Sequence, residues 1–291
     1  MKISRRKEEI VSAYIFLSPS LIIIFIFVLG PAIAAAYLSF TKYNIIKPPR
    51  WIGLSNYLSL IENDSFITSL LNTAHYALIY VPGKIIIGLF LAVLLQSAFL
   101  KGRGLFLTIF YIPVITSMPA AAYIWLFLYR PGDGILNKLL NTLGFRSASF
   151  IYDTDTVIES ITAVTIWKDF GLTVVLFIAG LQAIDKQFYQ AAQIDGANSW
   201  EQFYNITLPL LQPVFLLVLI TTIIDSFNVF TAILIMTSGG PAEGSTTIVH
   251  QIYSNAFIYL KMGRAAAMSM TLLILVTFLS IPAFYQLKKQ I

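Results

Sequence analysis

The sequence predicts an all-α integral membrane protein with six membrane-spanning helices. Of its 291 residues, 57% are hydrophobic and only 11% are charged, whereas about 25% of residues are charged in soluble globular domains. The mean hydropathy is +0.78. Six runs have the roughly 20 mostly apolar residues that a helix needs to cross a hydrocarbon core about 30 Å thick. These runs are 12–40, 67–96, 105–129, 157–181, 210–236 and 262–287.

The first run follows the basic segment MKISRRK, an arrangement that also occurs in signal peptides. It is too long for a signal peptide, and no cleavage-site pattern follows a short apolar core. We therefore expect a retained span, with 1–11 as a cytoplasmic tail and 12–291 as a single transmembrane domain. Prolines inside the runs are compatible with spans, because neighbouring helices can satisfy the freed carbonyl groups.

The distribution of Lys and Arg predicts that both termini lie in the cytoplasm, since basic residues favour that side. With this orientation nine basic residues near span ends are inside and six are outside. The outside segments are then 41–66, 130–156 and 237–261, and the one long inside segment is 182–209. The nine inside residues are Lys2, Arg5, Arg6, Lys7, Lys101, Arg103, Lys186, Lys288 and Lys289.

The inside segment has the pattern of a short amphipathic helix that Gly196 interrupts. Tyr189, Ala197, Trp200 and Tyr204 follow one another at spacings of 8, 3 and 4, which would place them on one helical face. Two interpretations are open on physical grounds. The helix could rest on lipid headgroups, or its apolar face could fill a groove in a cytoplasmic partner.

The same segment contains a motif of known transport proteins. The stretch QAAQIDGANSWEQFYNITLPLL resembles the EAA motif of bacterial ATP-binding-cassette importer permeases: E-A-A, three residues, G, nine residues, I, one residue, L-P. The matching positions are Ala191, Ala192, Gly196, Ile206, Leu208 and Pro209.

Similarity to this family extends over nearly the whole chain. It includes IGLSNYLSL at 52–60, GRGLFLTIFYIPVI, TIWKDFGLTVVLFIAGLQAI, TSGGP at 237–241 and GRAAAMSM at 263–270. Together these stretches resemble the six-helix sugar permeases of the maltose-transporter type, and in particular the first of the two paired subunits.

This resemblance implies a type I importer permease fold in which the EAA segment is the helix that couples the permease to its ATPase. The coupling residues would be Gln190, Ala191, Ala192, Asp195, Gly196, Ala197, Leu208 and Pro209. Gln190 replaces the leading glutamate of the motif, so an ion pair from that position is replaced by at most a neutral hydrogen bond.

The resemblance also implies a set of partners in a bacterial cytoplasmic (inner) membrane. These are a second homologous permease, two ATPase subunits, an extracytoplasmic solute-binding protein, a sugar substrate and the lipid bilayer. ATP and Mg²⁺ would bind the partner ATPase, and this chain would bind no cofactor of its own.

The sequence contains no set of residues typical of an enzyme active site. It has no cysteine, and its two histidines, His75 and His250, have no second ligand at metal spacing. The tripeptide PGK at 82–84 is not a phosphate-binding loop, because position 78 is Leu78 rather than glycine and Ile85 follows the lysine. No long Lys/Arg run supports nucleic-acid binding. We therefore expect a non-catalytic chain without a metal site.

Polar groups inside the spans mark the expected solute path, because such groups are costly in hydrocarbon and face the bundle interior or a wet cavity. Two roles are open for the charged ones: an interhelical ion pair, such as Lys84 or Lys168 with Asp225, or part of a sugar site. The polar candidates are Asn72, His75, Lys84, Lys168, Asp169, Asp225, Ser226 and Asn228. The residues predicted to line the substrate path are Asn228, Phe227, Asp225, Ser226, Trp167 and Lys168.

The expected function is therefore that of a permease subunit of an ATP-driven, binding-protein-dependent sugar or oligosaccharide importer. An alternative is an ion-coupled secondary carrier for a small polar solute, using the intramembrane charges Lys84, Asp169 and Asp225. Secondary carriers commonly contain internal repeats, and none is evident between the first three and the last three spans.

Overall fold

The computed structural model describes residues 2–96 and 102–288 of the chain, and these residues are mainly α-helical. Lys101 and Lys289, which contribute to the predicted orientation, lie outside the described residues. The chain divides into two compact units, Met1–Glu62 with Ile252–Thr271, and Asn63–Gln251 with Leu272–Ile291.

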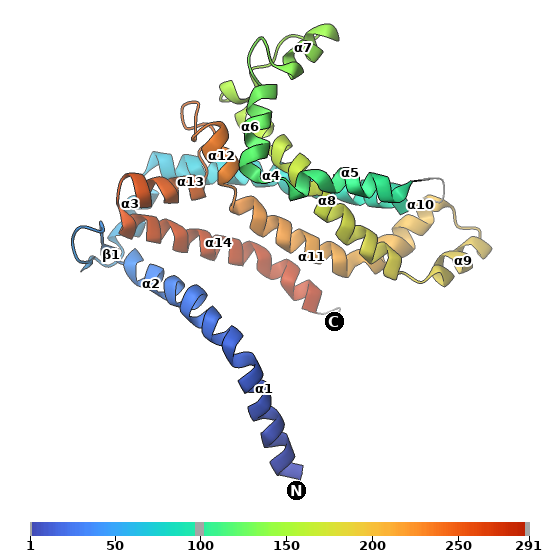
Figure 1. Ribbon diagram of the computed structural model, residues 1–291, viewed down its shortest axis with the longest axis horizontal. Helices are drawn as coiled ribbons and strands as arrows, with labels where there is room; N and C mark the ends of the chain where they lie inside the picture. The colour runs from blue at the N-terminus through green and yellow to red at the C-terminus, as the bar shows by residue number, and fades with distance from the viewer. Residues whose placement is uncertain (1, 97–101, 289–291) are drawn as a thin grey trace. The chain divides into compact units, whose positions relative to one another are not determined.

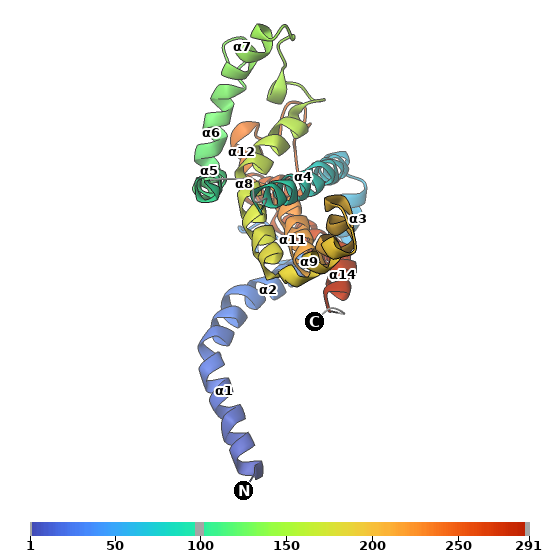
Figure 2. The same ribbon diagram turned by 90° about the vertical axis from the view of Figure 1, so that its right-hand side faces the viewer.

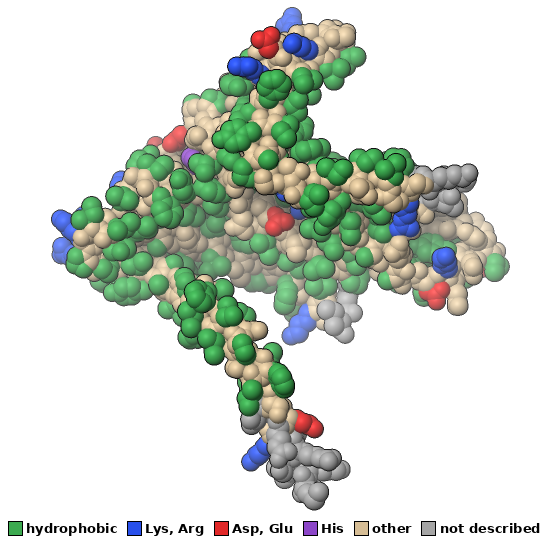
Figure 3. All heavy atoms as spheres, viewed as in Figure 1, with side chains coloured by type: hydrophobic (Ala, Val, Ile, Leu, Met, Phe, Trp, Pro, Cys, Tyr) green, Lys and Arg blue, Asp and Glu red, His purple; other side chains and the backbone are tan. Residues whose placement is uncertain are grey.

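The first unit begins with a long apolar helix. α1 (Lys2–Ile24), the π-helical turn η1 (Phe25–Leu29) and α2 (Gly30–Ser39) follow one another, and Ser12–Ser39 is long and apolar enough to cross a membrane. Figure 3 shows apolar side chains along α1 and α2. None of the most apolar window of Ser12–Ser39 is buried within the chain, as expected for a helix surrounded by lipid or by another subunit.

A small hairpin and a short helix complete the first half of this unit. β1 (Thr41–Lys42) pairs antiparallel with β2 (Arg50–Trp51), and α3 (Ser55–Ile61) follows. The Asn56 side-chain amide donates to the carbonyl oxygens of Ser39 and Thr41 at 2.8 and 2.9 Å. The unit also contains η4 (Ser254–Ile258) and the first part of α14 (Met262–Lys288), where the Gly263 amide donates to the Tyr43 carbonyl.

Three long helices form the centre of the second unit: α4 (Asp64–Gln96), α8 (Val157–Ala183) and α11 (Leu208–Phe227). α4 packs along both α8 and α11, and α5 (Arg103–Ile115) packs along α8; Figures 1 and 2 show these helices. Glycines permit the close approaches, because a Cβ at Gly171 would clash with the Phe110 carbonyl oxygen of α5. Two clusters of buried apolar side chains form the core: one lies between α4, α8 and α11, and the other lies between α4, α8 and residues from 122–151 and 229–236.

The third expected span, 105–129, is not one straight helix. α5 ends at Ile115, α6 (Met118–Leu128) begins three residues later, and the two are bent by 97°. Thr116 and Ser117 between them have extended backbone. Pro113 in α5 removes a helical hydrogen bond, and Pro119 suits the first turn of a new helix, where no amide donor is needed.

Short elements connect the long ones. Among the described residues, five helices are long and apolar enough to span a membrane, or six when the bent pair counts as one span. The connecting elements are α7 (Ile135–Thr142), η2 (Phe150–Tyr152), α9 (Lys186–Ile194), α10 (Ser199–Gln202), η3 (Phe203–Thr207), α12 (Thr231–Met236) and α13 (Ile248–Tyr253).

Candidate functional site

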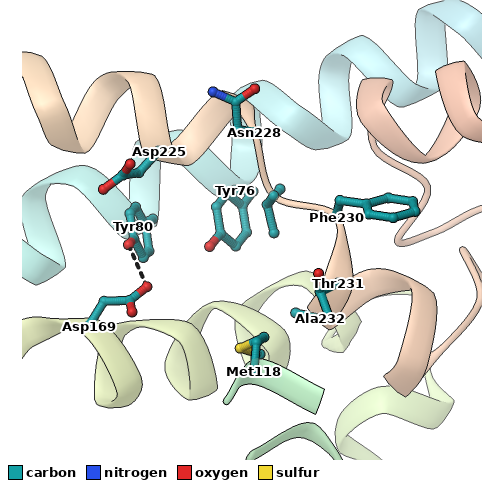
Figure 4. A pocket seen from close by; sticks show the side chains of 10 residues that line it. Tyr76, Tyr80, Met118, Asp169, Asp225, Asn228, Phe230, Thr231 and Ala232 are labelled. Atoms are coloured by element: carbon teal, nitrogen blue, oxygen red, sulfur yellow. Dashed lines mark hydrogen bonds between the residues drawn. The ribbon is translucent and has the colours of Figure 1, made fainter. Parts of the chain in front are cut away.

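A polar pocket of about 330 Å³ lies within the second unit, at the end of α11. α4, α6, α8 and α11 contribute to its wall, together with residues 228–230 and the first turn of α12 (Figure 4). The pocket combines tyrosine rings, carboxylates and an amide, which are the groups that pack against and hydrogen-bond a polyhydroxylated ligand. It is lined by Tyr76, Tyr80, Met118, Asp169, Asp225, Asn228 and 229–232.

The aromatic wall comes from two tyrosines one turn apart on α4. The rings of Tyr76 and Tyr80 are stacked with centroids 5.2 Å apart. The Tyr76 hydroxyl donates to Thr165 Oγ1 at 2.8 Å, and the Tyr80 hydroxyl donates to Asp169 Oδ2 at 2.9 Å. Both rings are therefore held in place from α8.

A chain of charges connects the three long helices beside the pocket. Lys84 on α4 donates from Nζ to Asp225 Oδ2 on α11 at 3.2 Å and to the Tyr80 hydroxyl at 3.1 Å. On α8, Lys168 Nζ pairs with Asp169 Oδ1 at 3.2 Å. Of the two predicted alternatives for an ion pair to Asp225, the structure contains the one from Lys84, and Lys168 pairs with its sequence neighbour.

The end of α11 contributes to the wall of the pocket. Asn228 follows the last helical residue, and its side-chain amide donates to the Ile224 carbonyl at 2.8 Å, which satisfies an orphan acceptor at the helix end. The chain then runs without helical structure to α12. This break places Asn228 and the following backbone along the pocket wall.

The structure brings only some of the predicted path residues to the pocket. Asp225 and Asn228 line it. Ser226 is buried and donates to the Ile223 carbonyl, and Phe227 is buried in the interior. Trp167 packs edge-to-face on Trp125 with centroids 5.5 Å apart. Lys168 reaches the pocket only through its pair with Asp169.

Two further polar candidates of α4 have other surroundings. Asn72 donates to the carbonyl oxygens of Glu243 and Thr246 and so holds the loop after α12. His75 Nε2 lies 3.2 Å from a carboxylate oxygen of Glu159, and both side chains are about half exposed. Among the described residues no group of three or more His, Cys, Asp or Glu is arranged to hold a metal ion.

Sequence reasoning missed Tyr76 and Tyr80. A signal was present, because Tyr76, Tyr80 and Lys84 follow at intervals of four and therefore share one face of α4. The chain has 15 tyrosines, and without the partner helix nothing distinguishes these two from tyrosines at a membrane interface.

The segment between α8 and α11 forms two short helices. α9 is capped by Asp185, whose side chain accepts from the Gln187 amide, and α10 is capped by Asn198 and Glu201, each of which accepts from the other's backbone amide. Between them Gly196 has a left-handed φ of +83°. Tyr189 thus lies on α9, before the break, whereas Trp200 on α10 and Tyr204 in η3 lie after it with stacked rings 6.1 Å apart, so the predicted common face holds for the last two but not for Tyr189.

This segment is largely exposed. Gln190, Ala191, Asp195 and Gly196 are exposed, whereas Ala192, Ala197 and Leu208 are partly buried and Pro209 is exposed in the first turn of α11. Large apolar side chains also project from it, namely Phe188, Ile194, Trp200 and Tyr204. Glu201 caps α10, because its side chain accepts from the Asn198 amide.

The pocket and the exposed segment together are typical of a helical membrane transport subunit. Two helices, α8 and α11, connect the polar cavity with the exposed segment. The chain belongs to the family of binding-protein-dependent transport system inner membrane components, whose model matches residues 84–289. The family predicted from the EAA motif and the surrounding stretches is therefore confirmed.

Individual relatives agree with this assignment. The chain is 34% identical to the probable ABC transporter permease protein YesP of Bacillus subtilis, over 98% of this chain and 93% of the relative. It is 30% identical to the sn-glycerol-3-phosphate transport system permease protein UgpA of Agrobacterium fabrum, over 96% and 95%.

Solved structures share the fold. A chain of a bacterial ABC transporter involved in the import of the acidic polysaccharide alginate matches with a TM-score of 0.86, 22% identity and 99% coverage of both chains. The alginate transporter in complex with an alginate pentasaccharide-bound periplasmic protein matches with a TM-score of 0.85, 22% identity and coverage of 97% and 96%. The fold is thus the type I permease fold.

Proposed function

We propose that the chain is the membrane-spanning, non-catalytic permease subunit of an ATP-driven importer for a sugar or oligosaccharide in a bacterial cytoplasmic membrane. The observation that carries this proposal is the exposed segment α9–Gly196–α10, which connects directly to the two helices that hold Asp169 and Asp225 at the pocket. Family membership supports a transport role, and the mixture of tyrosine rings and acceptors supports a polyhydroxylated solute.

The partners follow from this role. A second, homologous permease would supply the other half of the path, two ATPase subunits would bind ATP and Mg²⁺, and a solute-binding protein would deliver the sugar. With both termini in the cytoplasm, the exposed segment faces the ATPases. Its projecting apolar side chains, including Ile194 and Trp200, suit insertion into a groove of such a partner.

Closure of the ATPase pair on ATP would draw the exposed segments of the two permeases together. The segment follows α8 and precedes α11 in the chain, so its displacement would act on both of these pocket helices. The path then opens outward, and the binding protein releases its sugar into it.

A matched pair of glycine substitutions tests the coupling role. Gly196 and Gly144 both have φ +83° and open space where a Cβ would be, so Gly196→Leu and Gly144→Leu impose the same local strain of about 1–2 kcal/mol. Each tagged variant is purified from its native membranes in mild detergent, and the co-purifying proteins are identified by mass spectrometry.

We expect the native chain and Gly144→Leu to recover an ATPase and a second six-span protein, and Gly196→Leu to recover the second permease without the ATPase. Full retention of the ATPase by Gly196→Leu would contradict the coupling role. Recovery of the native chain alone, with uptake in vesicles that lack ATP, would contradict the importer itself.

A further inference from the structure

We propose that the pocket selects neutral or cationic saccharides against anionic ones, because the charged side chains that line it are carboxylates, whereas the lysines paired with them are largely buried behind them. This inference rests on the proposed function, since it names the substrate class of the same pocket. Asp169 and Asp225 are the residues that determine the selectivity.

The exposures of the charged side chains differ by sign. Asp225 is 56% exposed and Asp169 33%, whereas their partners Lys84 and Lys168 are 5% and 15% exposed. Both carboxylates line the pocket and neither lysine does. The four side chains together are neutral, but a ligand in the pocket lies closer to the carboxylates than to the lysines. An anionic ligand would therefore be repelled by the carboxylates more strongly than it is attracted by the lysines.

The hydrogen-bonding capacity has the same bias. Lys84 uses Nζ on Asp225 and Tyr80, and the Tyr80 hydroxyl is donated to Asp169. Among the described residues, no hydrogen bond reaches Oδ1 of Asp225 or Oδ1 of Asn228, whose side-chain amide donates one of its two hydrogens to the Ile224 carbonyl. These two oxygens are acceptors, whereas the Thr231 hydroxyl, which also lines the pocket, can donate as well as accept. Sugar hydroxyls and ammonium groups can donate to the two oxygens, whereas a uronate carboxylate or a phosphate offers only further acceptors.

The relatives make this inference specific. Two of the proteins to which the chain is similar are named for anionic solutes, the acidic polysaccharide alginate and sn-glycerol-3-phosphate. The surface charge of this pocket predicts that the present chain differs from both in substrate class.

The pocket potential can be measured without knowing the substrate, because the chain contains no cysteine. The variant Asn228→Cys places a single thiol in the pocket of the full chain, reconstituted in lipid nanodiscs. Its modification rates are measured with a cationic trimethylammonium-ethyl and an anionic sulfonatoethyl methanethiosulfonate, each normalised to its rate with 2-mercaptoethanol. A neutral methyl methanethiosulfonate reports only how accessible the thiol is to the reagent.

We expect the normalised cationic rate to exceed the anionic rate by about tenfold, the lower end of electrostatic rate effects in charged clefts. Adding Asp225→Asn or Asp169→Asn should lower this ratio, and adding Lys84→Met should raise it. The control Asp133→Asn removes an exposed carboxylate that does not line the pocket and should leave the ratio unchanged. A ratio at or below one in Asn228→Cys would overturn the inference.

A second measurement connects the potential to the substrate class. Glucose, glucosamine and glucuronate share one ring and differ in charge, and each is tested at equal concentration for slowing modification of Asn228→Cys by the neutral reagent. Slowing by glucose and glucosamine but not by glucuronate supports the inference, and slowing by glucuronate at least as strong as by glucose refutes it. If no sugar slows the reaction while the charge ratio stays high, the sugar site fails and the electronegative pocket stands.

Discussion

The ion pair between Lys84 and Asp225 is buried on one side only, so its two partners should differ in what their removal costs. Asp225→Asn leaves the Lys84 ammonium, 5% exposed, without a counter-charge. Lys84→Met leaves a carboxylate that is 56% exposed and can be hydrated. When one partner of a buried pair is removed, most of the loss of stability comes from the charge that is left buried and unpaired, whereas an exposed pair contributes little to stability.

The distance between Lys84 and Asp225 sets the size of the expected loss of stability. Unit charges 3.2 Å apart attract by about 5 kcal/mol at an effective dielectric constant of about 20 and by about 1 kcal/mol in water. Lys84 keeps the Tyr80 hydroxyl as an acceptor at 3.1 Å, which reduces the penalty. We expect Asp225→Asn to lower the free energy of unfolding by about 2–4 kcal/mol and Lys84→Met by about 1 kcal/mol or less.

The assay is a double-mutant cycle in mixed micelles, with unfolding by sodium dodecyl sulfate followed by tryptophan fluorescence. The double variant Lys84→Met/Asp225→Asn should be about as stable as Lys84→Met alone, because no buried charge remains. Glu159→Gln is the matched control, since its pair with His75 has the same 3.2 Å distance but is about half exposed on both sides; it should change stability by about 0.5 kcal/mol or less. Equal costs for the two single variants, with additive behaviour in the double variant, would refute the reasoning.

Three further perturbations follow from single contacts. Tyr80→Phe removes the hydroxyl that connects Lys84 to Asp169 and should cost about 1–3 kcal/mol in the same unfolding assay; no loss would show that water replaces it. Burial lowers the pKa of His250, so the unfolded chain takes up its proton first as pH falls below about 6.5. The stability contributed by neutral His250 is therefore complete above that pH and lost below it, and the midpoint of thermal unfolding should fall more between pH 7.5 and 5.5 in the native chain than in His250→Gln. Asn198→Ala removes the side chain that accepts from the Trp200 and Glu201 amides and should cost about 1 kcal/mol locally, measured as faster hydrogen exchange at those two amides with unchanged exchange in α11.

The pair of Lys84 with Asp225 was within reach of sequence reasoning because charge is rare in apolar runs and each intramembrane charge needs a partner. The break at Gly196 was predictable for a similar reason, since glycine is the residue that adopts a left-handed φ without cost. The need of each charge for a partner and the break at Gly196 are local chemistry, whereas the choice of Lys84 rather than Lys168 as the partner of Asp225 depends on how the helices pack.

Other features depend on where helices meet. Ser226 and Phe227 have the composition of a sugar site, but the α11 turn that presents Asp225 and Asn228 to the pocket turns these two inward. The 97° bend after Ile115 was missed because hydropathy alone does not report the backbone direction at Thr116 and Ser117. Helical spacing likewise cannot be carried across Gly196, where the helical phase is lost.

The distance over which this permease would transmit force follows from its chain order. From Asp169 to the end of α8 at Ala183 is 14 residues, and from the start of α11 at Leu208 to Asp225 is 17, or about 21 and 26 Å at 1.5 Å per residue. Between these ends the helices touch at Gly180, where an added Cβ would lie 2.7 Å from Leu211 Cδ1 and 2.9 Å from Val214 Cγ2. A close-packed contact of this kind resists sliding, so a shift of the exposed segment moves α8 and α11 together. Gly88 of α4 makes the same kind of contact with α8, where an added Cβ would clash with Thr173 Cγ2, so α4 with Tyr76 and Tyr80 would move together with the two pocket carboxylates.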